Sequence, residues 1–170
     1  MTASGMSTER EELIRAALEF GRRAFPEDRP TGEAEGEFNR AGWKQLAEFG
    51  LFGMPVPASH GGLGLGLGDV IAVMETLGYA IADQGLLFSA NAHLWTNVIP
   101  VLIYGTAEQK QEYLPRMASG EWIGANAGSE PDAGSDIFAM RTRAVKTATS
   151  YVLNGTKTFC TNAQVADAFV

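Results

Sequence analysis

The residues with the clearest chemical potential lie in residues 126–136, a segment that concentrates small residues, hydroxyls and acids. Gly134 permits backbone conformations that other residues avoid, so the amides of Gly134 and Ser135 can point together at an anionic oxygen such as that of a pyrophosphate. Ser129 and Ser135 add hydroxyl donors. The same residue types also form ordinary polar turns. Composition alone therefore leaves a ligand-binding loop and a plain turn as alternatives.

Three other features resemble chemical sites. The glycine-rich residues 60–68 contain Gly-x-Gly steps, but they lie between expected helices and lack the lysine of a phosphate-binding loop. We interpret them as a flexible connector whose glycines let helices pack closely. His93 and Trp95 lie in a very apolar segment, where pocket lining and core packing both remain open. Cys160 has no histidine near it in sequence, which favours a small buried residue over a nucleophile.

The elements that must position these residues begin with a bundle of roughly five helices, each marked by apolar residues at three- and four-residue steps. Pro100 predicts a kink or a break in the apolar residues 84–104. Thr106 and Gln109 have the spacing of a capping box. We expect helices over residues 7–25 and 38–50, with a mobile loop between them over residues 26–36. A third helix is expected to have Asp69 as its N-cap, and the last helix to end at Ser119 and Gly120.

Past residue 121 the pattern changes to short β segments. Residues 137–147 are rich in Thr, Val and Ala. Asn154-Gly155 is a strong hairpin signal, and we expect it to join strands at residues 151–153 and 156–161. A sheet this small leaves an exposed edge, so further chain or a partner is expected to cover it.

Length and composition fit one small domain together with part of another. The 170 residues are 45% hydrophobic and 19% charged, which is enough apolar material for a core. We expect a helical domain over residues 1–122 and a partial β domain over residues 123–170. The net charge is −7, and Lys and Arg do not cluster in the sequence. This charge pattern argues against a nucleic-acid partner.

The sequence also bears on location. One cysteine allows no intrachain disulfide, so a cytoplasmic location is the expectation. Residues 1–10 are small, polar and charged, unlike a signal peptide or a presequence. Apolar runs fall short of the roughly 18 residues of a membrane span, so none is expected.

Several ordered blocks carry a family resemblance. The run S-E-P-D-A-G-S-D at residues 129–136 resembles the signature of acyl-CoA dehydrogenases, in which Thr or Ser, Glu-Pro, two residues and Gly-Ser-Asp follow one another. The run Y-V-L-N-G-T-K at residues 151–157, followed by Thr161-Asn162, is similar to the hairpin and flavin-contact strand of that family. Two upstream blocks are similar as well, residues 55–64 and residues 105–121. The resemblance covers essentially the whole chain.

The resemblance implies an α+β fold: an N-terminal α-helical bundle, then the first strands of a mainly antiparallel β-barrel-like domain, with the C-terminal helical domain of the family absent. It implies FAD as the cofactor. Ser129 matches a hydroxyl at the isoalloxazine edge, and Thr161 matches a hydroxyl that faces flavin N5. Ser135 matches a serine near the pyrophosphate and the acyl-CoA. The implied cofactor-binding residues are Asn126, Ala127, Gly128, Ser129, Gly134, Ser135, Phe159, Cys160 and Thr161, and the implied substrate-binding residues are Ser135, Phe88, Ser89 and Ala92.

The chain departs from the family pattern at a few of these positions. Gly128 replaces a larger side chain, Asn126 stands where some members carry an aromatic residue, and Phe159-Cys160 replaces Trp-Ile. Phe159 keeps an aromatic face but has no indole donor. Outside the implied site, Asp136 is expected to order its loop as an acceptor and Lys157 to be a solvated strand residue.

The resemblance implies an oxidoreductase of fatty acid metabolism that removes an α-proton and a β-hydride from an acyl thioester. The family's glutamate base lies in the C-terminal domain, so no catalytic residue is expected in this chain. The substrate is an acyl-CoA by default, or an acyl group on a carrier protein. The implied acceptor is an electron-transfer flavoprotein or another acceptor. The chain is then a fragment of a longer enzyme, one half of a split enzyme whose partner subunit supplies the C-terminal domain, or a non-catalytic homologue. The resemblance also implies a homo-oligomer or such a partner subunit.

Overall fold

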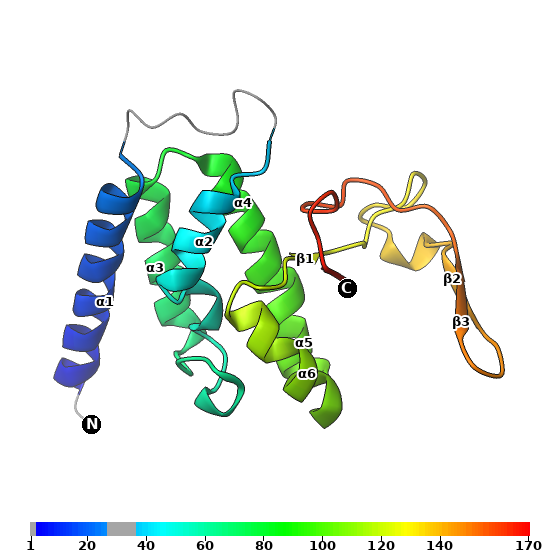
Figure 1. Cartoon of the computed structure of the whole chain (residues 1–170), viewed down its shortest axis with the longest axis horizontal. Helices are drawn as coiled ribbons and strands as arrows, with labels where there is room; N and C mark the ends of the chain where they lie inside the picture. The colour runs from blue at the N-terminus through cyan, green and yellow to red at the C-terminus, as the bar shows by residue number, and fades with distance from the viewer. Residues whose placement is uncertain (1–2, 27–36) are drawn as a thin grey trace.

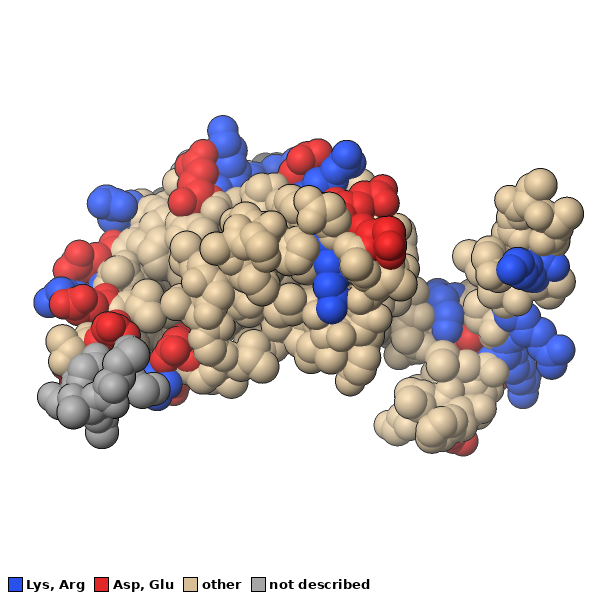
Figure 2. All heavy atoms as spheres, turned by 90° about the horizontal axis from the view of Figure 1, so that it is seen from below, with Lys and Arg blue, Asp and Glu red and all other residues tan. Residues whose placement is uncertain are grey.

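The computed structural model describes residues 3–26 and 37–170, and it consists of a helical bundle from which a small β part extends to one side (Figure 1). The expected loop over residues 26–36 falls, apart from its first residue, outside the described residues. Figure 2 shows one face of the bundle with charged side chains mainly along its edges, and basic side chains gathered on the β part. The α+β class with an N-terminal helical bundle is confirmed.

The first helix, α1 (Ala3–Ala24), packs along α3 (Leu67–Ala80). Gly21 makes the close approach, because a Cβ there would lie 2.5 Å from Cβ of Ala80. As expected, α1 ends just before Pro26. The expectation that Asp69 caps α3 is wrong. Gly66 is the N-cap, and Asp69 lies in the first turn, where it pairs with Arg10 of α1 at 2.7 Å.

The second helix, α2 (Arg40–Glu48), leads into two short 3₁₀ turns, η2 (Leu51–Gly53) and η3 (Ala58–His60). The glycine-rich segment that follows is hydrogen-bonded to this region and is not a loose connector. The Leu63 amide donates to the Gly53 carbonyl (2.9 Å), and the Leu65 amide donates to the Met54 carbonyl (2.7 Å). The expected close packing is real at Gly62, where a Cβ would lie 2.5 Å from the Gly53 carbonyl oxygen.

One helical run crosses the centre of the bundle. It comprises α4 (Gln84–His93), the π-helical turn η4 (Leu94–Val98) and α5 (Ile99–Tyr104). The run does not break at Pro100. The π turn precedes the proline and absorbs the local change in backbone hydrogen bonding.

By length and composition this run could cross a membrane, since it has 21 residues and a mean hydropathy of 1.4. The expectation that no apolar segment reaches that length is therefore wrong. Of its most apolar window, 44% is buried inside the bundle. The core explains the apolar character, because Leu87, Ala90 and Leu94 belong to the main hydrophobic cluster.

The last helix of the bundle is α6 (Ala107–Ala118). Its capping box is confirmed: the Thr106 hydroxyl accepts from the Gln109 amide (3.3 Å), and the Gln109 side chain accepts from the Thr106 amide (2.8 Å). The helix ends as expected before Gly120, which has a positive φ of 71°. Leu114 and Met117 of α6 join a second, smaller buried cluster with Val56 and Val98.

Four short strands form two separate pairs in the described chain, with no closed barrel. The strands β1 (Gly124–Ala125) and β4 (Ala168–Phe169) pair in parallel over two residues. The strands β2 (Arg143–Lys146) and β3 (Tyr151–Asn154) pair antiparallel and lie far from the bundle in Figure 1. The 3₁₀ turn η5 (Ile137–Ala139) precedes β2.

The hairpin expected at Asn154-Gly155 is wrong. The actual turn is at residues 147–150, where the Thr147 hydroxyl accepts from the Ser150 amide at 3.0 Å and closes the loop. Gly155 follows β3 and lies against Thr142. A Cβ at residue 155 would overlap the Thr142 side chain. Residues 156–161 form no strand, and the Thr158 amide donates to the Ser129 carbonyl in the loop after β1.

Candidate functional site

A cavity of about 320 Å³ lies between the central helical run and the loops of the β part. It brings together residues that are far apart in the sequence. Asn126 follows β1, while Phe159 and Thr161 come from the loop after β3. The helical side supplies Phe88 and Ala92 of α4. The full lining is Phe88, Asn91, Ala92, Trp95, Thr96, Asn126, Phe159 and Thr161.

A second, wider cavity of about 890 Å³ adjoins the first and shares Phe88, Phe159 and Thr161 with it. Ser89 and Cys160 line this second cavity. Cys160 is half-buried, and its thiol lies 3.7 Å from the Thr158 carbonyl oxygen. All three substrate-binding residues expected on α4 thus face one or both cavities.

The rest of the expected first segment lies beside the cavities. Ala127, Gly128 and Ser129 are half-buried, and the Ser129 carbonyl accepts from the Thr158 amide at 2.9 Å. Gly134 and Ser135 are exposed beyond the tight turn that Glu130 and Ala133 close. Gly134 does not adopt a positive φ, so the expected use of its conformational freedom is wrong. The binding roles of these residues stay predictions.

The loop that carries Phe159 and Thr161 is held in an uncommon backbone conformation. Phe159 has a φ of 54° and Asn162 a φ of 69°, both in the left-handed region. The Asn162 side-chain amide donates to the carbonyls of Ser89 and Gly124, each at 3.1 Å. This anchor fixes the loop to both α4 and β1. The Phe159 ring is 95% exposed, so its aromatic face is free for contact.

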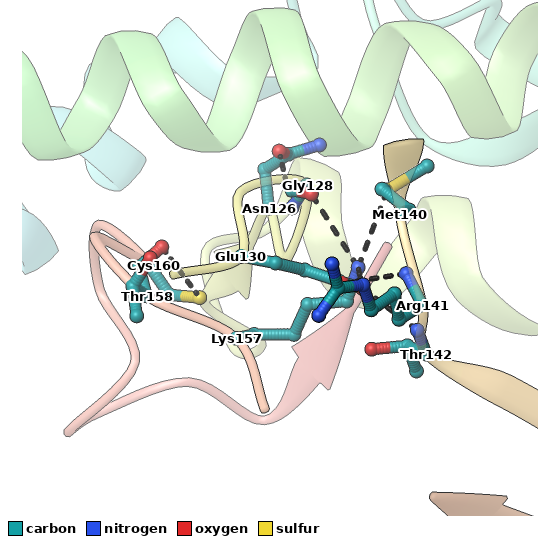
Figure 3. A network of polar contacts seen from close by, with 9 residues as sticks. All are labelled: Asn126, Gly128, Glu130, Met140, Arg141, Thr142, Lys157, Thr158 and Cys160. Atoms are coloured by element: carbon teal, nitrogen blue, oxygen red, sulfur yellow. Dashed lines mark hydrogen bonds and ion pairs between the residues drawn. The ribbon is translucent and has the colours of Figure 1, made fainter. Parts of the chain in front are cut away.

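Glu130 is a buried carboxylate in the same region (Figure 3). Its pKa is lowered to about 2, chiefly by the hydrogen bond from the Arg141 amide (2.7 Å) and further by Thr142 and Lys157. A carboxylate this acidic and this fully bonded is no proton acceptor near neutral pH. Glu130 is therefore a poor candidate for the base, and the absence of a catalytic residue from this chain stays a prediction.

Two expectations in this network are wrong. Lys157 is not a solvated strand residue, because its ammonium pairs with Glu130 at 3.0 Å and its side chain is only 24% exposed. Asp136 does not order the loop with its side chain, which makes no capping hydrogen bond at η5. Glu130 orders the loop instead. Because its oxygens are buried away from water, they accept hydrogen bonds only from protein donors.

The alternatives for His93 and Trp95 are now decided. His93 is fully buried in the core: its Nδ1 accepts from the Gly124 amide (2.9 Å), and its Nε2 donates to the Met117 carbonyl (3.1 Å). Burial lowers its pKa to about 4, although the Met117 hydrogen bond acts in the opposite direction. Trp95 lines the smaller cavity, and its indole donates to the Asn91 side chain at 3.0 Å.

The unusual residues Asn126 and Gly128 are linked. The Asn126 side-chain oxygen accepts from the Gly128 amide at 3.1 Å, and a Cβ at residue 128 would lie 2.9 Å from that oxygen. A larger residue at 128 would therefore displace the Asn126 side chain. The two departures from the family pattern form one local arrangement.

Sequence reasoning missed Asn91 and Thr96 as lining residues. Their spacing from Phe88, Ala92 and Trp95 is that of one helical face, which was the available signal. The described residues contain no cluster of His, Cys, Asp and Glu suited to a metal ion.

The fold of this chain is similar to that of solved enzymes, among them one described as an oxidase and one bound to FAD. The prolyl acyl carrier protein oxidase AnaB matches with a TM-score of 0.89 and 38% identity over 95% of this chain and 43% of that chain. PigA with FAD and proline matches with a TM-score of 0.89 and 37% identity over 99% of this chain and 43% of that chain. The chain belongs to the acyl-CoA dehydrogenase family. Its N-terminal domain model matches residues 7–121 and its middle domain model residues 125–170.

Curated relatives agree with this assignment. An L-prolyl-[peptidyl-carrier protein] dehydrogenase from a Serratia species is 38% identical over 97% of this chain and 43% of its own length. The mitochondrial isovaleryl-CoA dehydrogenase of Pongo abelii is 36% identical over 98% of this chain and 40% of its own length. The chain thus spans about two-fifths of the length of these relatives.

Proposed function

We propose that this chain forms one wall of an FAD-dependent dehydrogenase that oxidises the α,β carbon–carbon bond of an acyl thioester. The proposal rests mainly on one observation: Asn126, Phe159 and Thr161 line the same cavity as Phe88 and Ala92. Membership of the acyl-CoA dehydrogenase family supports the same reaction.

The residues present fit FAD. An isoalloxazine ring has a flat apolar face and a polar edge, which need an aromatic or apolar surface and hydrogen-bonding groups. Phe159 supplies an exposed aromatic face. The buried oxygens of the Thr158 hydroxyl and the Asn162 side chain have no hydrogen-bond partner in the described chain. The amides of Gly134 and Ser135 likewise donate no hydrogen bond among the described residues, which leaves them free for an anionic group.

In the reaction, bound FAD supplies a two-electron oxidant. The role of this chain is to bind and orient. Thr161 lines both cavities, and we assign its hydroxyl the role of orienting the ring at the reacting side. Phe88 and Trp95 exclude water from the acyl group. The proton acceptor is proposed to come from outside residues 1–170, as the family resemblance implies. Glu130 does not fit that role, because it is held ionised and fully bonded.

We propose a short branched or cyclic acyl group as the substrate. The small size of the cavity and the Trp95 side chain in its wall favour a short group. The named substrates of the relatives, prolyl and isovaleryl, support this size. An acyl-CoA is the first candidate, and a carrier-protein thioester is the second because of the prolyl-carrier relatives.

The other parts of the proposal concern the setting. An electron-transfer flavoprotein is the proposed acceptor, supported by a matching structure described as the electron transferring flavoprotein of Acidaminococcus fermentans, with a TM-score of 0.86 and 32% identity. We also propose a role in fatty acid metabolism, a homo-oligomeric assembly and a cytoplasmic location. The location rests on the single cysteine.

The test is anaerobic reduction of the flavin in the full-length protein by isovaleryl-CoA and by prolyl-carrier protein. We expect bleaching of the flavin absorbance with one of the two, and slower bleaching after Thr161→Val with the fold intact. A full-length protein that takes up no FAD would refute the proposal. A protein that takes up FAD but is reduced by neither thioester would be a non-catalytic homologue or have another substrate.

A further inference from the structure

Glu130 links the two segments that approach the cavity from the β part. Its side-chain oxygens accept from the amides of Arg141 (2.7 Å) and Thr142 (2.9 Å). The same carboxylate pairs with the Lys157 ammonium at 3.0 Å. Figure 3 shows Glu130 at the centre of this network, with Lys157 reaching it from the other segment. A buried carboxylate with this many donors has a fixed position.

Lys157 extends the connection to the residues that follow Asn126. Its ammonium lies 3.4 Å from the Gly128 carbonyl oxygen, and the next amide, that of Thr158, donates to the Ser129 carbonyl at 2.9 Å. Two successive residues of one segment therefore bond two successive carbonyls of the other. The contact ends one residue before Phe159.

The segment from Phe159 to Thr161 depends on these flanking contacts. Phe159 combines a positive φ with a 95% exposed side chain, so burial of its own ring does not hold its backbone there. A non-glycine residue keeps such a conformation only when its surroundings impose it. Lys157 holds the segment on one side, and Asn162 holds it on the other through the Ser89 and Gly124 carbonyls.

We propose that Glu130 and Lys157 are positioning residues whose ion pair sets the place of the Phe159 to Thr161 segment against Asn126. The pair acts through this segment on the flavin-facing wall, so the inference rests on the proposed function. Removal of the pair leaves a buried charge without its partner, which disrupts the local arrangement more than loss of a surface pair.

The chain offers a matched control in the same region. Arg141 and Asp132 form an ion pair at 3.1 Å, but their side chains are 78% and 70% exposed. Arg141→Met removes that surface pair and leaves the backbone amide that binds Glu130. Lys157→Met removes the buried pair with the same change of residue type. Lys157→Arg keeps a charged donor and serves as the rescue variant.

The experiment uses the full-length protein and two measurements: the FAD dissociation constant from flavin fluorescence quenching, and hydrogen exchange of the Thr158 amide in the FAD-free protein. For Lys157→Met we expect FAD to bind about tenfold more weakly and the amide to exchange about tenfold faster. Arg141→Met should change both by less than about twofold, as expected of an exposed pair. Lys157→Arg should restore most of both.

Lys157→Met values equal to those of Arg141→Met would overturn the inference. So would a change in only one of the two measurements, because the pair must act on FAD through the segment. If Lys157→Met fails to fold, Glu130→Gln, which keeps the side-chain shape, is measured in the same way with the same expectation. A wild-type protein that binds no FAD would refute the proposed function, whereas Thr158 exchange would still decide whether the pair holds the segment.

Discussion

The buried His93 makes the stability of this fold dependent on pH, in a window above that of the described acids whose pKa is lowered. Its ring is fully buried between the Met117 carbonyl and the Gly124 amide. Burial lowers the folded-state pKa from 6.5 to about 4. When the pH falls, the unfolded chain gains a proton on His93 before the folded chain does. The contribution of neutral, buried His93 to the free energy of unfolding is therefore fully present above pH 6.5. It is lost as the pH falls toward the folded-state pKa of about 4.

The magnitude follows from the two pKa values. At about pH 5 the unfolded histidine is almost fully protonated and the folded one almost fully neutral, so the loss relative to pH 7 is about 2 kcal/mol. The pKa of Glu130 is lowered as well, to about 2 by the Arg141 amide and its other donors. Its contribution is lost only at lower pH, below the ordinary value of 4.5. The window from pH 7 to pH 5 thus isolates the histidine.

The assay is urea unfolding at several pH values, followed by tryptophan fluorescence, because the Trp43 ring lies 5.2 Å from the His93 ring. His93→Gln should be less stable at pH 7 by about 1–3 kcal/mol, since one buried hydrogen bond is lost, and its stability should change little down to pH 5. A pH dependence of His93→Gln equal to that of the wild type would refute the reasoning.

Three further substitutions test the fold and the cavity. Thr106→Ala removes the capping box of α6 and should lower the free energy of unfolding by about 1 kcal/mol in urea titrations. Gly62→Ala should cost about 1–3 kcal/mol in the same assay, because the new Cβ would press on the Val56 and Gly53 carbonyl oxygens. Trp95→Ala should join the cavity to the neighbouring one of about 410 Å³ that Trp95 also lines, and so raise kcat/KM for longer acyl thioesters relative to short ones. An unchanged chain-length preference would contradict that role for Trp95.

Much of the helical bundle could be predicted from the sequence because its signals are local. The capping box at Thr106 acts across three residues, and the stop at Pro26 acts within one turn. Such interactions do not depend on the rest of the fold. The family could likewise be recognised from short ordered blocks around Glu130 and Thr161. The family resemblance assigned Phe88, Ser89 and Ala92 to the substrate site, and all three line one or both cavities.

Three of the errors show how the tertiary structure chose between possible partners. Asp69 binds Arg10 of another helix, 59 residues away, and does not cap its own. Asn154-Gly155 has the preferred hairpin residues, but β3 pairs with β2 through the turn at residues 147–150. Lys157 lies just after β3, and its ammonium forms an ion pair with Glu130 at 3.0 Å. For Asp69 and Lys157, an ion pair to a distant residue outweighed a weak local preference.

The sequence by itself thus determined the family, the helices and the residue types available to a flavin and an acyl group, because these depend on composition and on contacts within a few residues. Only the tertiary structure decided which of those residues meet. It brought Asn126 beside Thr161 and α4, buried Glu130 against Lys157, and left Gly134 and Ser135 exposed on the far side of a turn. The physical reason is that burial makes unpaired polar groups costly, so distant segments arrange themselves until the buried charges and amides find partners.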